Sequence, residues 1–180
     1  MLGVLDAVFH SPESLGIEGD FDEVGETFEE NALGKARFFA EKAGMVAVAD
    51  DSGIFIEALA DELGLKTRRW GAGHEASDEE WLAHFMERMG EEENRKAKFV
   101  CAAALVTPDG DGDDVVVFGE TCGAISGEIE VPVKAGIPLS SVFRPDGHEK
   151  VYAALSEAEK NEISHRGRAF AELLKYLGDA

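Results

Sequence analysis

The sequence predicts an α/β protein with a mixed, twisted sheet. Helical and strand-like segments alternate along the chain, which is typical of proteins whose helices cover a sheet. Two strand-like segments at residues 98–107 and 114–126 follow one another closely, which is typical of a long hairpin and favours a mixed sheet over a purely parallel one. The 180 residues are enough for one domain or for two small lobes that share a core.

The first predicted helix begins after an irregular segment, residues 1–25, that contains scattered glycine, proline and acidic residues. Thr27 is a suitable N-cap, and Glu30 three residues later completes a capping box. Gly44 lies just past the last residue with helical spacing of apolar side chains. The sequence therefore predicts a helix between Thr27 and Gly44.

The next element is a strand that we expect to be interrupted. Residues 45–49 form a short apolar run, which predicts a buried strand. The polar segment Asp50-Asp51-Ser52-Gly53 predicts a break, after which residues 54–56 resume the apolar pattern. This places two adjacent carboxylates at the end of a strand.

Four further elements follow. A second helix begins at Ser77, again with a capping-box glutamate, Glu80, and with a stripe of large apolar residues that we assign to the core. The two strands of the hairpin come next, and the six residues between them, rich in Asp and Gly, predict its turn. A last helix is predicted over residues 164–177.

Composition excludes several classes of protein. Seventeen basic and 37 acidic residues give a formal net charge of −20, a field that repels nucleic acids and anionic membranes, so we expect neither as a partner. No apolar run approaches the ~20 residues that span a bilayer, and the first ten residues contain no Lys or Arg, so we expect no secretory signal. Cys101 and Cys122 are too few for a disulfide framework, and we expect a cytoplasmic protein. In such an acidic chain, a phosphate site requires local basic residues or a divalent cation.

The pair Asp50 and Asp51 is the strongest candidate site. Ligands of α/β proteins bind where strands end, and a carboxylate there can hold Mg²⁺ or take a proton from water. Ser52 adds a hydroxyl and Gly53 permits a tight turn. The alternative interpretation of this segment alone is an ordinary acidic turn.

Two other segments concentrate basic or amide side chains. Ser164-His165-Arg166-Gly167-Arg168, preceded by Lys160, gathers cations at a helix start, where anions bind favourably. Asn31 and Lys35 lie four residues apart, on one face of the first predicted helix. The alternative interpretations are a solvated helix start and the polar face of an amphipathic helix.

Together these segments resemble the inosine triphosphate pyrophosphatase family, also called non-canonical purine NTP pyrophosphatases or dITP/XTP diphosphatases. The family's motifs are T-F-E-E-N-A-x-x-K-A, A-D-D-S-G and E-K-x-x-I-S-H-R-G, and they occur here in this order at residues 27–36, 49–53 and 159–167. The similarity covers most of the chain from about Glu23 onward.

This resemblance implies an α/β fold of two lobes with a nucleotide cleft between them, usually as a homodimer. It implies Mg²⁺-dependent hydrolysis of nucleoside triphosphates, with a non-canonical purine base such as that of ITP, dITP or XTP, to the monophosphate and pyrophosphate. By motif, Asp51 corresponds to the catalytic base and metal ligand, and Glu23 to a second metal ligand. Six residues fall at substrate-binding positions: Ser52, Asn31, Lys35, Lys160, His165 and Arg166.

Two departures from the family's pattern affect these expectations. No T-x-N-x-x-K phosphate loop precedes Asp22, so we expect residues 1–180 to form a single domain that lacks the family's first strand and loop. The family's G-F-G-Y-D-P segment reads Gly136-Ile137-Pro138-Leu139-Ser140-Ser141 here, which replaces a stacking aromatic and an acid by Ile137 and Ser140. The alternative function is therefore a catalytically weak or inactive nucleotide-binding relative.

A calcium-binding role rests only on the acidic residues between Asp109 and Glu120, which favour a hairpin turn instead.

Overall fold

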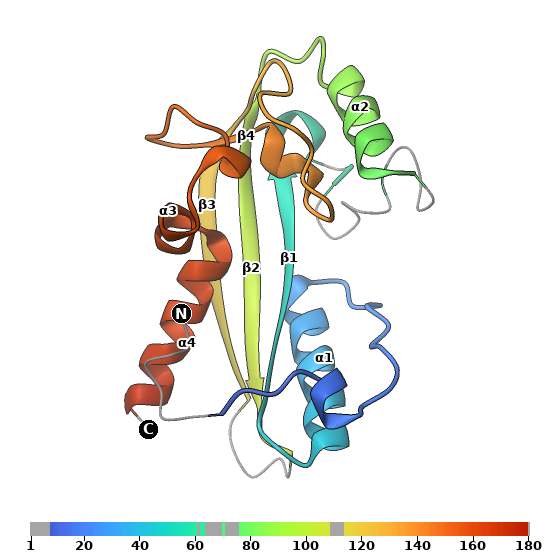
Figure 1. The fold of residues 1–180 in the computed structure, drawn as a ribbon, viewed down its shortest axis with the longest axis vertical. Coiled ribbons are helices and arrows are strands. Elements are labelled where there is room, and N and C mark those ends of the chain that lie inside the picture. The colour runs from blue at the N-terminus through green and yellow to red at the C-terminus, as the bar shows by residue number, and fades with distance from the viewer. Residues whose placement is uncertain (1–7, 61, 64–69, 71–75, 109–113, 180) are drawn as a thin grey trace. The chain divides into compact units, whose positions relative to one another are not determined.

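The computed structural model describes residues 8–60, 62–63, 70, 76–108 and 114–179 (Figure 1). The helices within these residues are α1 (Phe28–Ala43), α2 (Asp78–Arg88), α3 (Glu157–Ile163) and α4 (His165–Asp179). The strands are β1 (Ala47–Ile56), β2 (Lys96–Val106), β3 (Val115–Ile125) and β4 (Phe143–Pro145). Among the described residues, no helix combines the length and the apolar character that crossing a membrane requires.

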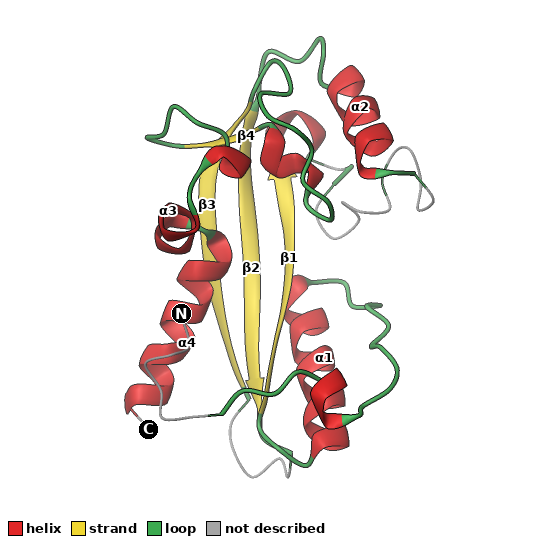
Figure 2. Cartoon of the chain, in the orientation of Figure 1, coloured by secondary structure: helices red, strands yellow, loops and turns green. Residues whose placement is uncertain are grey.

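The four strands form one sheet in the order β1-β2-β3-β4, so each strand lies beside its neighbour in the sequence (Figure 2). Successive strands run antiparallel, and the register of the short β4 pairs Gly123 with Pro145 and Ile125 with Phe143. This confirms the α/β class and a sheet that is not purely parallel. The predicted turn at residues 109–113 lies outside the described residues.

The chain divides into two compact units. The first unit comprises Met1–Ser52, Cys101–Gly119 and Ser164–Ala180, and the second comprises Gly53–Val100 and Glu120–Ile163. Helices α1 and α4 belong to the first unit, whereas α2, α3 and β4 belong to the second. The strands β1, β2 and β3 each contribute residues to both units.

Helix α1 begins and ends where its caps predict. Thr27 Oγ1 accepts the N–H of Glu30 at 3.1 Å, which satisfies one of the free donors of the first turn. The Glu30 carboxylate accepts the N–H of Glu26 at 2.7 Å, one residue earlier than in a regular capping box. At the other end, Gly44 has a φ of 61°, and its N–H donates to the Ala40 carbonyl.

Strand β1 differs from the prediction, because it continues without a break through residues 50–53. Side chains alternate between the two faces of a strand, so Asp50 and Asp51 point to opposite faces. Asp51 meets Asn31 of α1, and Asp50 meets Arg166 of α4. Both carboxylates thereby have polar partners within the first unit, which is why a strand can carry them in its middle. The same contacts place α1 and α4 against opposite faces of the sheet in this unit.

Helix α4 confirms the predicted last helix and packs directly on β3 at Gly119. A Cβ added to Gly119 would lie 2.1 Å from the His165 carbonyl oxygen and 2.5 Å from the Ala169 nitrogen. Only a glycine permits so close an approach of the helix backbone to the strand. Cys101 and Ala103 of β2 and Ala169 of α4 are fully buried in the same contact. This contact holds the start of α4, which carries His165 and Arg166, close against β3 at Gly119.

The second unit has a core of larger apolar residues. Helix α2 confirms its prediction: Ser77 and Glu80 form both halves of a capping box. The large residues of its stripe are buried as expected: Trp81, Leu82, Phe85 and Met89. Helix α3 and strand β4 were not predicted from the sequence.

Candidate active site

The site in the first unit starts from Asn31, on the first turn of α1. This side chain is only 4% exposed. Its Nδ2 donates to Asp51 Oδ2 at 2.9 Å, and its Oδ1 accepts the N–H of Gly25 at 2.8 Å. Both ends of the amide are therefore used, and they tie the loop before α1 to β1.

Asp51 is half-buried and has a perturbed acidity. Its Oδ1 accepts the N–H of Ser52 at 2.8 Å, while Oδ2 is bound by Asn31. Burial raises the pKa of Asp51, and the negative charge of Glu23 acts in the same direction. The hydrogen bonds from Asn31 and Ser52 and the charge of Lys35 oppose this shift without cancelling it. A raised pKa makes a carboxylate a better acceptor for a proton from water.

Lys35 lies one turn of α1 after Asn31 and reaches the same stretch of β1. Its Nζ donates to the Asp50 carbonyl oxygen at 3.2 Å and forms an ion pair with Glu23. Lys35 therefore holds Glu23, from the irregular loop before α1, close to the strand that carries Asp51.

On the opposite face of β1, Asp50 accepts three hydrogen bonds on a single oxygen. The donors to Oδ2 are Arg166 Nε at 2.8 Å, Ser52 Oγ at 3.0 Å and Cys101 Sγ at 3.6 Å. Burial alone would raise the pKa of Asp50, but Arg166 and the other donors outweigh it, and the net pKa is lowered. Burial raises the pKa of Cys101 to about 12, so at neutral pH this residue is a thiol that can donate.

His165 opens α4 beside Arg166. Burial, together with the positive charge of Arg166, lowers the pKa of His165 to about 4. The imidazole is therefore neutral at pH 7, with one nitrogen that donates and one that accepts hydrogen bonds. Ser164 Oγ accepts the N–H of Gly167 at 2.8 Å and so satisfies a free donor of the first turn of the helix.

The sequence profile of the Ham1 family matches residues 4–176. The chain belongs to the Ham1 family. It is 40% identical over 161 residues to the dITP/XTP pyrophosphatase of Frankia alni, which covers 86% of this chain and 78% of the relative. It is 39% identical over 158 residues to the dITP/XTP pyrophosphatase of Streptomyces coelicolor, covering 86% of this chain and 76% of the relative.

Solved structures of Ham1 proteins have the same fold. The HAM1 protein of Coxiella burnetii superimposes with a TM-score of 0.87 at 34% identity, covering 99% of this chain and 90% of that one. The Ham1 protein of Staphylococcus aureus gives a TM-score of 0.81 at 32% identity, and the match covers 93% of this chain and 84% of that one. These similarities confirm the family membership that the three sequence motifs indicated.

The first unit of this Ham1 protein holds seven of the eight site residues that the family resemblance implies. Direct contacts join six of them, through Asp50, into one network: Glu23, Asn31, Lys35, Asp51, Ser52 and Arg166. His165 is adjacent to Arg166 in α4. The eighth residue, Lys160, lies in α3 of the second unit, where its N–H donates to the Ser156 carbonyl. The geometry also adds a residue to which the motifs assign no role, Asp50.

The segment at residues 136–141, which departs from the family's G-F-G-Y-D-P pattern, also lies in the second unit. Ile137 is exposed, whereas Ser140 is buried and its hydroxyl donates to the Ile137 carbonyl at 2.6 Å. The Ser140 hydroxyl is therefore used within its own turn.

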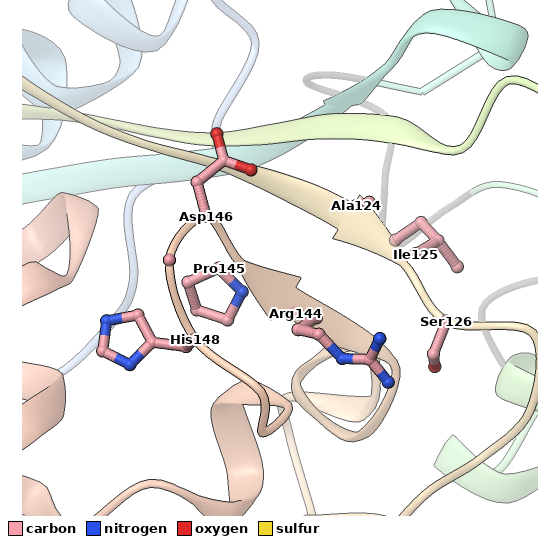
Figure 3. Close-up of a pocket in the computed structure, with 8 residues that line it drawn as sticks. Ala124, Ile125, Ser126, Arg144, Pro145, Asp146 and His148 are labelled. Atoms are coloured by element: carbon pink, nitrogen blue, oxygen red, sulfur yellow. The ribbon is translucent and has the colours of Figure 1, made fainter.

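A cavity of about 190 Å³ occurs elsewhere in the second unit (Figure 3). It lies at the end of β3 and along β4, and its walls include Ile125, Ser126, Arg144 and His148. None of the residues singled out by the motifs lines it. The network around Asp51, and not this cavity, is therefore the candidate active site.

Proposed function

We propose that this protein is a nucleoside triphosphate pyrophosphatase, which cleaves (deoxy)nucleoside triphosphates to the monophosphate and pyrophosphate. The observation that carries the proposal is the Asp51 carboxylate, held by Asn31 within a network that includes Lys35 and Arg166. Lys35 donates to the Asp50 carbonyl oxygen and Arg166 donates to the Asp50 carboxylate, so two cations lie next to Asp51 along β1. Such cations suit a phosphate substrate in a chain of net charge −20. The names of the relatives support the same reaction and favour dITP and XTP as substrates.

In the proposed reaction, Asp51 accepts a proton from the water that attacks the phosphorus. The water attacks the α-phosphorus. The bond between the α-phosphorus and the oxygen that bridges the α- and β-phosphates then breaks, and pyrophosphate leaves with that oxygen. Lys35 and Arg166 stabilise the negative charge that develops on the phosphate oxygens. Lys160 and Ser52 are further phosphate-binding residues in this proposal.

A divalent cation, Mg²⁺, fits the residues present. Asp51 and Glu23 are like charges close enough for Glu23 to raise the pKa of Asp51, and a cation would relieve this repulsion. Mg²⁺ is commonly held by one or two carboxylates, with water and substrate phosphates as the other ligands. Among the described residues, no cluster of three or more His, Cys, Asp or Glu that could hold a metal is present. When bound, the cation would offset phosphate charge and polarise a phosphoryl oxygen.

The proposal assigns base recognition in part to His165. A neutral imidazole can donate to or accept from the 6-keto edge of a purine. Ile137 and Ser140 provide neither an aromatic stacking surface nor a carboxylate, so we expect weaker discrimination against canonical purine triphosphates. The proposal also includes a cytoplasmic homodimer, with no nucleic acid or membrane as partner.

The decisive test is the Asp51→Asn variant. Removal of a general base lowers kcat by ~10²–10⁴-fold, and weaker metal binding would add to this loss. The measurement is release of pyrophosphate from dITP in the presence of Mg²⁺, with thermal unfolding as a check of the fold. Asp114→Asn is a matched control, because Asp114 is an exposed acid of the same unit, paired with Arg37. An unchanged kcat in folded Asp51→Asn would contradict the role of Asp51. A wild-type protein that binds dITP without turnover would instead support a non-catalytic nucleotide-binding relative.

A further inference from the structure

One oxygen atom, Asp50 Oδ2, joins three elements of the first unit. It accepts from Arg166 of α4, from Ser52 of β1 and from Cys101 of β2. Three donors on one oxygen fix the carboxylate in direction, and they also keep it ionised. Asp50 faces away from Asp51, so it is not placed to share the proton-accepting role of that residue.

The contact with Arg166 uses one particular nitrogen. Nε donates to Asp50, whereas Nη1 and Nη2 have no hydrogen-bond partner among the residues that the structure describes. The guanidinium side chain is 54% exposed, while the Asp50 side chain is 23% exposed. A guanidinium held through Nε keeps its two terminal nitrogens as a planar pair of donors, which matches two oxygens of a phosphate.

An arginine without such a contact samples many rotamers. Four rotatable bonds separate the guanidinium from the backbone, and a partner on Nε removes most of that freedom before any ligand arrives. A second feature limits the arginine further: the start of α4 touches β3 at Gly119, so the backbone of Arg166 is fixed as well.

We propose that Asp50 is a positioning residue that orients Arg166 for phosphate binding, by occupying Nε and leaving Nη1 and Nη2 for the substrate. This inference rests on the proposed function, because it takes the ligand of Arg166 to be the phosphate chain of a nucleotide. It assigns Asp50 no contact with substrate, metal or the attacking water.

The test is a double-mutant cycle of Asp50→Ala and Arg166→Ala, measured as kcat/KM for dITP. Loss of orientation at a reacting group costs ~10²-fold or somewhat less, so we expect Asp50→Ala to lower kcat/KM by ~10–100-fold. In the Arg166→Ala background the same change should cost no more than ~2-fold, since residues that act through one contact are not additive. Equal losses in both backgrounds would overturn the proposal.

Two further variants keep the test interpretable. Asp50→Asn preserves the size of the side chain and one acceptor oxygen for Nε, so we expect it to fold and to lose less activity than Asp50→Ala. Asp114→Asn removes the negative charge from another Asp–Arg pair of the same unit, between Asp114 and Arg37, and we expect it to leave kcat/KM unchanged. A loss of the same size in Asp114→Asn would show a general effect of charge and would overturn the proposal.

A readout without turnover separates this inference from the proposed function. In ¹H–¹⁵N spectra of arginine side chains, the Nε–H of Arg166 should exchange slowly with water in the wild type and rapidly in Asp50→Ala. If the wild type hydrolyses no nucleoside triphosphate, the proposed function fails, and the cycle is measured as the affinity for inorganic pyrophosphate. The positioning role is overturned if Arg166→Ala leaves that affinity unchanged, or if the Nε–H is not protected in the wild type.

Discussion

Asn31 illustrates how one residue can set the geometry of two others. Its amide binds Gly25 on one side and Asp51 on the other, and Gly25 lies two residues after Glu23. The fit is tight, because a Cβ on Gly25 would lie 2.6 Å from Asn31 Oδ1. These contacts favour a role in which Asn31 holds the two proposed metal-binding carboxylates at a set separation.

We expect Asn31→Ala to weaken binding of Mg²⁺ or Mn²⁺ by ~10–100-fold, the usual cost of losing a group that orients a metal ligand. The measurement is calorimetry or Mn²⁺ electron paramagnetic resonance on the protein without nucleotide. Thr27→Ala is the matched control: it removes the N-cap of the same helix at a cost of ~1 kcal/mol, yet leaves both amide contacts in place. Equal metal affinity in the wild type and in Asn31→Ala would contradict this role.

Among the elements, α4 depends on the strand beneath it. The backbone of α4 touches β3 at Gly119, so any side chain there must push the helix away. We expect Gly119→Ala to lower the free energy of unfolding by ~1–3 kcal/mol, the usual cost of overpacking. Because the displaced turn carries His165 and Arg166, pyrophosphate release should fall as well. Gly127→Ala is the control, since nothing lies within 4 Å of its added Cβ. Thermal melts and activity of both variants check this, and a neutral Gly119→Ala would contradict it.

The elements that could be predicted are those whose determinants are local. The helices α1 and α2 begin at caps that lie within four residues of their partners, so the sequence alone contains the information. Strand β1 could not be predicted through its middle, because the partners of Asp51 and Asp50 lie 20 and 116 residues away. Strand β4 has only three residues and exists through its pairing with β3, which no periodicity in three residues can indicate.

The sequence predicted which residues form the candidate site better than it predicted how they contact one another. The motifs named Asp51, Asn31 and Lys35. In the structure, Asn31 donates directly to Asp51, and Lys35 donates to the carbonyl oxygen of the preceding residue, Asp50. The role of Asp50 required knowing that residues 50–53 remain a strand. Had the segment been interpreted as a strand, its alternation of faces would have separated Asp50 from Asp51 and directed it toward a different partner.

At the scale of the whole molecule, the net charge of −20 should make stability depend on salt. Like charges repel one another most in the compact state, and this repulsion acts over ~30 Å at 0.01 M salt but only ~3 Å at 1 M. We therefore expect the Tm to rise as NaCl increases from low to high concentration, measured by scanning calorimetry. Sucrose of equal osmolality is the control for a general solute effect. A Tm that stays constant or falls with NaCl would show that the ion pairs of the surface outweigh the repulsion.

The interleaving of the two units along the chain has a consequence for synthesis. The nascent chain emerges from the ribosome with its N-terminus first. The first unit therefore lacks α4 until Ser164–Ala180 have emerged. The second unit is completed only one residue earlier, at Ile163. During translation, the small residues Cys101 and Ala103 of β2 therefore stay uncovered until α4, which buries them in the folded protein, has emerged. A nascent chain with uncovered strands is prone to aggregation, so we expect this protein to be most exposed to aggregation before α4 has emerged.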